Sequence, residues 1–138
     1  MARLIDSSVA IAMERLGPIA AERLEFLRPS PVALASITVS EMLTGLYRSP
    51  AGRRRDQRQE FIEDLISQFP ILPFDLNAAR THASILDQLR RAAQPVGLND
   101  TLIAAIAQAN ECIVVTDNLR DFERIPGLIV ERPTWLGK

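Results

Sequence analysis

The chain has 138 residues, 47% of them hydrophobic and 24% charged, with a formal net charge of −1. This composition excludes a disordered protein, and so small a net charge excludes a general electrostatic attraction to nucleic acid. The strand-like amino terminus leaves no room for a signal peptide, and the apolar stretches fall short of the roughly 18 residues that span a bilayer. The single cysteine, Cys112, excludes an intramolecular disulfide. We expect a cytoplasmic protein without membrane contact, with one domain over residues 1–138.

Short apolar stretches alternate with helical patterns along the chain. The apolar stretches predict strands at 3–6, 32–37, 70–74, 112–116 and 128–131. Helical spacing predicts helices over 7–27, with a break near Gly17, and then over 38–48, 54–68, 77–93 and 100–110. Short strands that alternate with helices are typical of a parallel sheet covered on both faces. The predicted fold class is therefore α/β, in three layers, with a central, mostly parallel sheet of roughly five strands.

Acidic residues follow the ends of the predicted strands. Asp6 closes the first strand, Glu41 lies in the helix after the second, and Asp117 follows the fourth, with Asp121 close behind. Asp100 opens the helix that leads into the fourth strand. In open α/β sheets, ligands collect at the carboxyl ends of the strands. We therefore expect these acids to converge there, although only the topology decides whether Asp100 joins the same edge.

Each acid also has an ordinary structural explanation. Asp6 and Asp100 stand where helix N-caps are expected, and Asp121 could cap the turn that follows it. Thr38 and Glu41 have the spacing of a capping box, in which the glutamate bonds the N–H of the cap residue. Capping explains each acid singly. Several carboxylates at one edge, however, repel one another unless a cation neutralises them.

The expected cation is Mg²⁺ or Mn²⁺, because hard metals prefer carboxylate oxygen. One histidine, His82, and one cysteine cannot supply a zinc ligand set, and the same scarcity excludes a Ser-His-Asp triad. His82 lies in the middle of a predicted helix and is interpreted as a surface or packing residue. A receiver-type signalling domain also gathers acids and Mg²⁺, but it needs a lysine near them, and the only lysine is the terminal Lys138. No glycine-rich phosphate loop is present.

Five stretches stand in a fixed order along the chain. They are LIDSSVAI (4–11), SITVSEMLTGL (36–46), LPFD (72–75), VGLNDTLIAAIA (96–107) and VVTDNLRDFERIPGLIVE (114–131). In order and spacing they resemble the PIN domain and, more narrowly, the VapC-type toxins of bacterial toxin–antitoxin pairs. The resemblance implies a PIN-like fold and an endoribonuclease that depends on Mg²⁺ or Mn²⁺ and hydrolyses RNA phosphodiester bonds.

The resemblance also implies roles for the acids and for the polar residues beside them. The implied catalytic residues are Asp6, Glu41, Asp100 and Asp121, and the implied metal ligands are these four and Asp117. The side chains implied to orient carboxylates or water are Ser7, Thr116 and Asn118. A metal held there would activate water for in-line attack on a phosphodiester. Which residue of the 117–121 stretch completes the acidic site stays open.

RNA binding needs local positive charge, and the sequence concentrates arginine after residue 52. The candidate RNA-binding residues are Arg53, Arg54, Arg55 and Arg58. A solvated helix start explains these arginines equally well. The small number of aromatic residues favours single-stranded or looped RNA as the substrate.

The partners implied by the resemblance are a second copy of the chain and a cognate antitoxin whose arginine enters the acidic pocket. The apolar side chains of Met42, Leu46 and Tyr47, and the helix at 54–68, fit either these interfaces or the core. Two alternative functions stay open: a solitary housekeeping PIN nuclease, and a catalytically inert PIN-like binding module.

Overall fold

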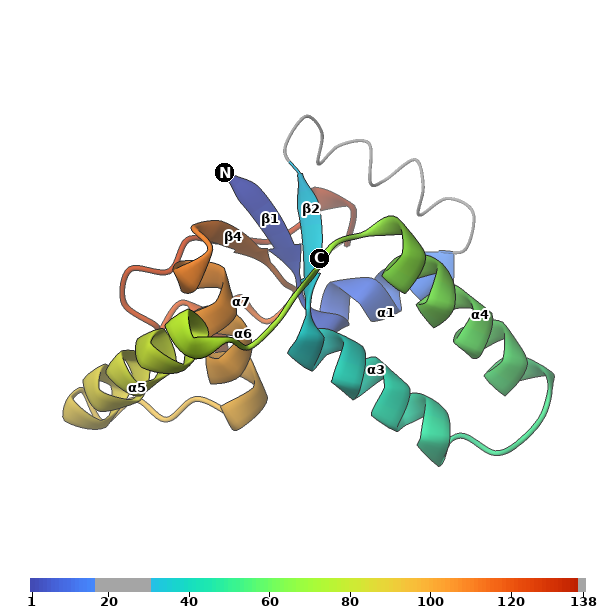
Figure 1. Ribbon diagram of the computed structural model, residues 1–138, viewed down its shortest axis with the longest axis horizontal. Coiled ribbons are helices and arrows are strands. Elements are labelled where there is room, and N and C mark those ends of the chain that lie inside the picture. The colour runs from blue at the N-terminus through green and yellow to red at the C-terminus, as the bar shows by residue number, and fades with distance from the viewer. Residues whose placement is uncertain (17–30, 137–138) are drawn as a thin grey trace.

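The computed structural model consists of one sheet of short strands with helices between them in sequence (Figure 1), and it describes residues 1–16 and 31–136. The strands are β1 (Ala2–Ile5), β2 (Val32–Ala35), β3 (Ile71–Leu72), β4 (Cys112–Val115) and β5 (Val130–Glu131). The helices are α1 (Ser7–Leu16), α3 (Ser36–Arg48), α4 (Arg53–Gln68), α5 (Leu76–Arg91), α6 (Leu98–Ala109) and α7 (Leu119–Phe122), followed by the 3-10 helix η1 (Thr134–Leu136). Within the described ranges, no helix has the length and apolar character that crossing a membrane requires.

The sheet has the strand order β3-β2-β1-β4-β5, and every neighbouring pair is parallel. In the central strand β1, Ile5 pairs with Leu34 of β2 and with Val115 of β4. Because all strands run the same way, their carboxyl ends meet at one edge of the sheet. Helix α6 leads back to the start of β4, so its first turn lies at that same edge. The topology therefore brings Asp100 to the other acids, and the predicted α/β class is confirmed.

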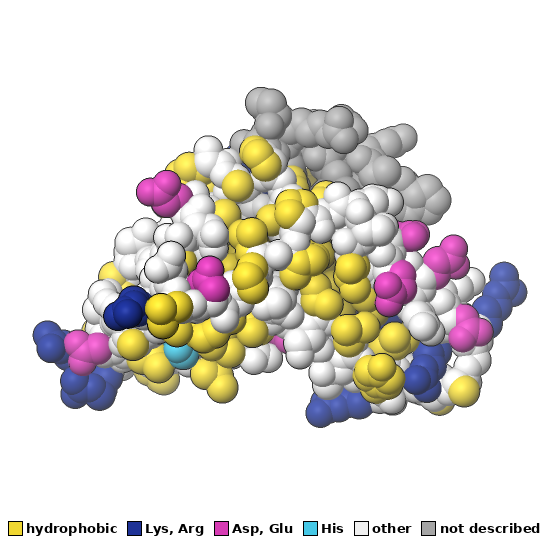
Figure 2. Space-filling view, in the orientation of Figure 1, with side chains coloured by type: hydrophobic (Ala, Val, Ile, Leu, Met, Phe, Trp, Pro, Cys, Tyr) yellow, Lys and Arg dark blue, Asp and Glu magenta, His cyan; other side chains and the backbone are white. Residues whose placement is uncertain are grey.

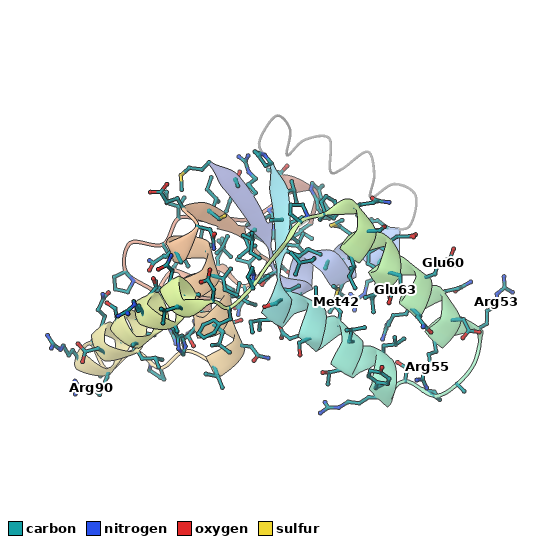
Figure 3. All side chains as sticks on the ribbon, viewed as in Figure 1. Met42, Arg53, Arg55, Glu60, Glu63 and Arg90 are labelled. Atoms are coloured by element: carbon teal, nitrogen blue, oxygen red, sulfur yellow. The ribbon has the colours of Figure 1, made fainter. Side chains whose placement is uncertain are left out.

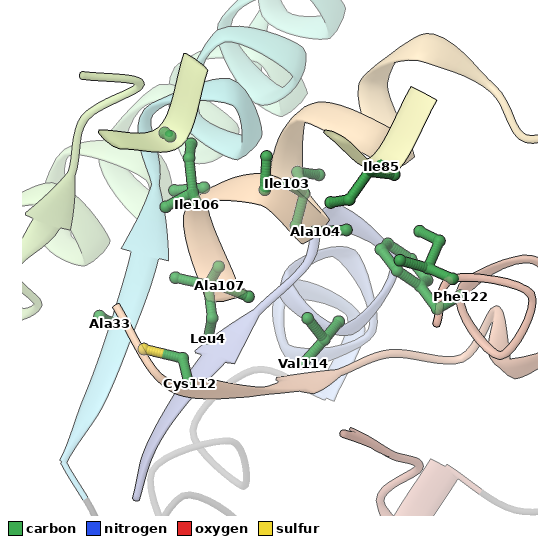
Figure 4. Packing of buried hydrophobic residues seen from close by; sticks show 14 of the residues in the cluster. Leu4, Ala33, Ile85, Ile103, Ala104, Ile106, Ala107, Cys112, Val114 and Phe122 are labelled. Carbon is green, nitrogen blue, oxygen red and sulfur yellow. The ribbon is translucent and has the colours of Figure 1, made fainter. Parts of the chain in front are cut away.

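Alternation of side chains along the strands divides the core into two halves. Leu4 and Val114 pack with α5, α6 and α7 on one face of the sheet, whereas Ile5 and Val115 pack with α1, α3 and α4 on the other. Figure 4 shows the first half, where Ile106 of α6 packs among strand residues. Helices therefore cover both faces, which gives the three layers expected from the sequence.

Small side chains bring α6 close to the sheet. Ala104, Ala105 and Ala107 are completely buried, as is Ile106. Alanine adds little bulk between helix and strand, so this helix packs tightly along its length. A helix held in this way also holds its first turn, and with it Asp100.

Several predicted boundaries differ from those of the structure. Strand β2 ends at Ala35, and α3 begins at once with Ser36, so Ser36 and Ile37, which were predicted as the end of the strand, are helical. Packing of this segment on the sheet overrides the strand preference of Ile37. Strands β3 and β5 have two residues each, fewer than predicted, and α6 begins at Leu98, two residues early. The predicted helical pattern beyond residue 16 lies outside the described residues.

Truncating a buried residue of α6 tests how strongly this helix is held. We expect Ile106→Ala to lower the free energy of unfolding by about 2–5 kcal/mol, because it removes buried apolar surface and leaves a cavity. Leu98→Ala is the matched control, since Leu98 lies on the same helix but is 64% exposed; it should change stability by less than about 0.5 kcal/mol. Urea unfolding followed by circular dichroism measures both. Equal losses in the two variants would contradict the packing described here.

Candidate active site

Asp6 follows the last residue of β1, and only 3% of its surface is exposed. Its Oδ1 accepts a hydrogen bond from the Ser8 hydroxyl at 2.6 Å and one from the Val9 N–H at 3.3 Å, and its Oδ2 accepts one from the Thr116 hydroxyl at 2.6 Å. Burial raises the pKa of Asp6, while these hydrogen bonds act in the opposite direction. The carboxylate is therefore fixed in one orientation at the edge of the sheet.

The two hydroxyl groups that bond Asp6 also hold the loop after β4. Ser8 Oγ accepts the backbone N–H of Asp117 at 3.0 Å, and Thr116 Oγ1 accepts that of Asn118 at 2.8 Å. Each hydroxyl thus donates to the carboxylate and accepts from the loop. This pairing fixes the 116–118 segment relative to Asp6.

Asp100 is the third residue of α6 and lies beside Asn118. The Asn118 Nδ2 donates to Asp100 Oδ2 at 3.2 Å and to Asp121 Oδ2 at 3.0 Å. Burial is the largest cause that raises the pKa of Asp100 to about 6, followed by the negative charges of Asp6, Asp121 and Glu41. Four carboxylates from separate parts of the chain therefore act on one another at this edge.

Glu41 completes the group from α3. Its Oε1 is buried and has no hydrogen-bond partner among the described residues. Burial is again the main cause that raises the pKa of Glu41; hydrogen bonds from the Asn99 and Ser7 side chains oppose it, and the charge of Asp6 adds to it. A buried carboxylate oxygen without a partner destabilises the fold unless something binds it. Glu41 Oε1 is thus available to a ligand.

The structure retains one of the capping interpretations and contradicts the others. Ala35 rather than Thr38 is the N-cap of α3, and Gly97 is that of α6; neither cap forms a side-chain hydrogen bond. In α7 the N-cap position belongs to Asn118. Of the four acids, Asp6 bonds a free N–H of a helix start, that of Val9. The positions of the other three acids are therefore not explained by capping.

Asp117 is separated from this group by its own ion pair. The Arg132 Nε donates to Asp117 Oδ1 at 2.8 Å, and half of the Asp117 side chain is exposed. Asp117 is also not among the charges that raise the pKa of Asp100, whereas Asp121 is. The structure therefore brings Asp121, and not Asp117, to the other acids.

The candidate RNA-binding arginines lie mostly at a distance from the acids. Figure 3 shows Arg53 and Arg55 at the outer end of α4, beyond the far end of α3 from the sheet. Helix α3 has 13 residues and is therefore roughly 20 Å long. Arg58 lies further along α4, where its Nε pairs with Glu14 of α1 at 3.2 Å. The structure does not place Arg53, Arg54 or Arg55 beside the acids.

The donor set of this edge fits a hard divalent cation. Its donors are all oxygen atoms, and three of the acids accept a hydrogen bond from an amide or hydroxyl that orients them. One buried oxygen, Glu41 Oε1, has no partner among the described residues. Mutual repulsion that raises the pKa of Asp100 is what a bound cation would relieve. Within residues 1–16 and 31–136, however, no group of three His, Cys, Asp or Glu side chains already has the geometry to hold a metal ion. The side chains of Asp100 and Asp121, which accept hydrogen bonds from Asn118, would have to turn toward the ion.

Three polar residues of the site were not predicted from the sequence. Ser8, which was not among the predicted residues, bonds Asp6, whereas the predicted Ser7 lies beside the Glu41 carboxylate together with Asn99. The D-S-S stretch signals a hydroxyl near Asp6 but not which serine supplies it. Arg132, the partner of Asp117, carries no local signal because it follows β5, 15 residues beyond Asp117.

His82 packs between α5 and α6, in agreement with its interpretation as a packing residue. Its ring stands edge-on to Phe74, with 5.7 Å between centroids, and its Nε2 lies 2.9 Å from Thr101 Oγ1. Because Thr101 donates its hydroxyl hydrogen to the Leu98 carbonyl, the Nε2–H of His82 is the donor of the other bond. Burial lowers the pKa of His82. The ring thus ties α5 to the first turn of α6, next to Asp100.

Comparisons with known proteins agree with this arrangement. The family model of the PIN domain matches residues 3–128. The chain is 35% identical to a Ribonuclease VapC of Rickettsia bellii over 130 residues, which cover 94% of this chain and 95% of the relative. It is 38% identical to the tRNA(fMet)-specific endonuclease VapC of Salmonella typhimurium over 76% of this chain and 77% of that protein. The crystal structure of DNA-bound VapBC from Salmonella typhimurium superposes with a TM-score of 0.84 and 31% identity, covering 96% of this chain and 98% of that one.

Burial of Asp100 and repulsion by the other acids predict that removing its charge stabilises the metal-free protein. The folded-state pKa of Asp100, about 6, exceeds its unfolded value of 3.8, so the free energy of unfolding falls as pH rises through this window and stays lowered above it. At pH 7.5 in EDTA, we expect Asp100→Asn to be more stable than the parent by about 1 kcal/mol, after allowing for solvent screening of a half-buried group. The difference should vanish below pH 4. Urea unfolding of both proteins measures it, and a less stable variant at pH 7.5 would contradict the repulsion.

Proposed function

Because the chain belongs to the PIN-domain family and, within it, to the VapC ribonucleases, we propose that it is the toxin of a toxin–antitoxin pair and acts as a Mg²⁺- or Mn²⁺-dependent endoribonuclease. The family predicted from the sequence is confirmed, and with it a nuclease activity. The proposal extends to the particular metal, to the residues that hold it and to the substrate. We assign the activity to one PIN-like domain over residues 1–138, working in the cytoplasm.

One observation supports the assignment of the site more than any other. Four carboxylates converge here, from the end of β1 and from α3, α6 and α7, so that burial and then the charges of the other three raise the pKa of Asp100. Glu41 adds a buried oxygen without a partner. A protein retains such mutual repulsion only where a cation or a reaction requires it. This uncompensated negative charge is what fits a hydrolase that binds a metal ion.

The four acids have distinct parts in the proposed mechanism. Asp6 and Asp100 would hold the divalent ion, with Asp121 completing its oxygen ligands. Bound there, the ion would lower the pKa of a coordinated water and offset charge on the phosphate. Glu41, whose pKa is raised by burial, would accept the proton of the attacking water.

The neighbouring polar residues act through these acids. The hydroxyls of Ser8 and Thr116 keep Asp6 in one orientation, and the amide of Asn118 holds Asp100 and Asp121 side by side. They position carboxylates without touching the substrate themselves. Asp117, paired with Arg132, has a smaller part.

The proposed substrate is RNA, and initiator tRNA is the first candidate to test. The Salmonella typhimurium relative, 38% identical to this chain, is named as a tRNA(fMet)-specific endonuclease. A looped region of tRNA also suits a protein with few aromatic residues, since unpaired backbone is accessible without reading a groove.

The proposed partners are a cognate antitoxin and a second copy of the chain. The similar crystal structure from Salmonella typhimurium is of a VapBC complex. A pocket with four carboxylates is a suitable target for an antitoxin arginine, which would occupy the place of the metal. An antitoxin bound in this way would keep the nuclease inactive.

Cleavage of RNA tests the assignment of the acids. Purified protein with Mn²⁺ should cut initiator tRNA, and Asp6→Asn, Asp100→Asn and Asp121→Asn should each lower the rate by on the order of a hundredfold or more, because each removes a charge that binds the ion. Asp64→Asn, an exposed position on α4, is the matched control and should cut at the parental rate. Gel analysis of end-labelled tRNA measures the rates.

The same assay decides between the two candidates for the fourth acid. Asp117→Asn should retain most of the activity, because its carboxylate pairs with Arg132 instead of facing the other acids. A loss as large as that of Asp121→Asn would show that the fourth acid has been assigned wrongly. Parental rates in Asp6→Asn and Asp100→Asn would refute the whole mechanism.

Metal binding can be measured without turnover. Millimolar Mn²⁺ should raise the melting temperature of the parent by a few degrees, since binding to the folded state stabilises it by mass action. Asp6→Asn should lose this rise, whereas Asp64→Asn should keep it. Sodium chloride at equal ionic strength controls for simple screening. A melting temperature that does not respond to Mn²⁺ would count against a metal site at this edge.

A further inference from the structure

Gly45 occupies a position in α3 for which the chain itself gives no reason. It is the tenth residue of a 13-residue helix, where glycine lowers helix stability relative to alanine. Its φ is not in the left-handed region, and within the described residues a Cβ there would meet no atom within 4 Å. Neither backbone conformation nor internal packing therefore requires glycine. Open space above a bare helix backbone suggests the close approach of something outside the chain.

Two surface hollows meet at this residue. The first lies on the side of α6 and includes Ser40, Thr44, Arg48 and Asn99 in its lining. The second lies on the side of α1 and α4 and includes Arg15, Met42 and Arg58. Glu41 and Gly45 line both hollows. In Figure 2 the lower edge of the molecule is indented between the parts that carry α5 and α3, in the region of the first hollow.

The helical repeat explains why the hollows join. Glu41, Gly45 and Arg48 are spaced i, i+4 and i+7, so they share one face of α3. A side chain at the middle position would form a ridge between the hollows. With glycine there, the surface passes from one hollow to the other across the helix, between the carboxylate of Glu41 and the guanidinium of Arg48.

We propose that these two hollows and Gly45 form a trough, here called the Gly45 trough, in which a single strand of the RNA substrate crosses α3 beside the acids. This inference rests on the proposed ribonuclease function and names how its substrate is held. One phosphate would lie at Glu41 and the other acids, and the neighbouring phosphates would lie toward Arg48 on one side and toward Arg15 and Arg58 on the other.

The chemistry of the first hollow and of the crossing point favours RNA over an apolar protein partner. The second hollow also contains apolar side chains, and its Arg58 is paired with Glu14, which leaves Arg15 as its unshared cation among the described lining residues. The crossing point lies between two charged side chains, and the first hollow offers hydroxyl and amide groups as well. Such groups suit a phosphate-ribose backbone, which binds through charge and hydrogen bonds without regard to base identity. A gap made by one missing side chain admits one strand and not a duplex.

The Gly45 trough also revises the RNA-binding residues predicted from the sequence. Of the four candidate arginines, Arg58 lines the trough. Arg53 points away from the molecule at the outer end of α4 (Figure 3), and Arg55 donates through Nη1 to the Ser49 carbonyl at 3.3 Å. Arg48 and Arg15, which stand outside the arginine-rich stretch, take their place.

Filling the trough tests the inference. Gly45→Leu should fold, with a melting temperature equal to or above that of the parent, because the side chain enters open space in a helix. It should lower kcat/KM for RNA by about tenfold or more, mainly through KM, while keeping the Mn²⁺-induced rise in melting temperature. Gly45→Ala should have a smaller effect in the same direction. Ala51→Leu, which adds bulk at an exposed position outside the trough, should cleave like the parent.

A charge variant gives an independent measurement. Arg48→Met should lower kcat/KM for RNA by about tenfold at low salt and reduce the slope of log(kcat/KM) against log[salt] by about one, as expected for the loss of one phosphate contact. Arg53→Met is the matched control and should leave rate and slope unchanged.

Each result decides a different point. If Gly45→Leu cleaves RNA as fast as Ala51→Leu, the trough does not hold RNA, and a variant that then fails to bind antitoxin would assign Gly45 to that partner instead. If the loss of cleavage comes with a change of oligomeric state in light scattering, Gly45 is a contact between copies, and the inference is wrong. If the parent itself does not cut RNA, the proposed function fails before the trough is tested.

Discussion

Repulsion among carboxylates at one edge of a parallel sheet is the constraint on which the rest of this structure depends. The strands place Asp6 there, and helices α3 and α6 bring Glu41 and Asp100 to it. Left to themselves, such charges would separate or take up protons. They stay together because hydroxyl and amide groups hold them and because the elements that carry them are tightly packed. A divalent ion bound at this edge would relieve the repulsion among the acids.

The geometry of the site therefore depends on the packing of the hydrophobic core. Burial of alanine and isoleucine along α6 fixes the helix on the sheet, and the bond from His82 to Thr101 fixes its first turn. Stability gained in the core offsets the free energy that the acids cost. In α3, glycine at position 45 lowers the stability of the helix but leaves open space on the surface beside Glu41.

Much of this could be predicted from the sequence, because it depends on local patterns. Alternating strands and helices gave the α/β class, and the acids after strand ends, with the motifs around them, gave the family; both predictions are confirmed. What failed depends on tertiary contacts. The capping box at Thr38 was wrong because packing on the sheet starts α3 three residues earlier. No local pattern shows that Ser8 bonds Asp6, or that Arg132, which follows β5, pairs with Asp117. The arginine-rich stretch lies at the far end of α3 from the acids. The roles assigned to the individual acids stay predictions.

The most direct test of the central claim is the titration of Asp100 itself. Carboxyl ¹³C chemical shifts of the metal-free protein, followed by NMR from pH 3 to 8, should give Asp100 a pKa of about 6. Saturating Mg²⁺, which is diamagnetic and leaves the signals sharp, should move that pKa well below its ordinary value, because the cation favours the charged form. A pKa near 3.8 without metal, or one that Mg²⁺ does not change, would show that the acids neither repel one another nor share an ion.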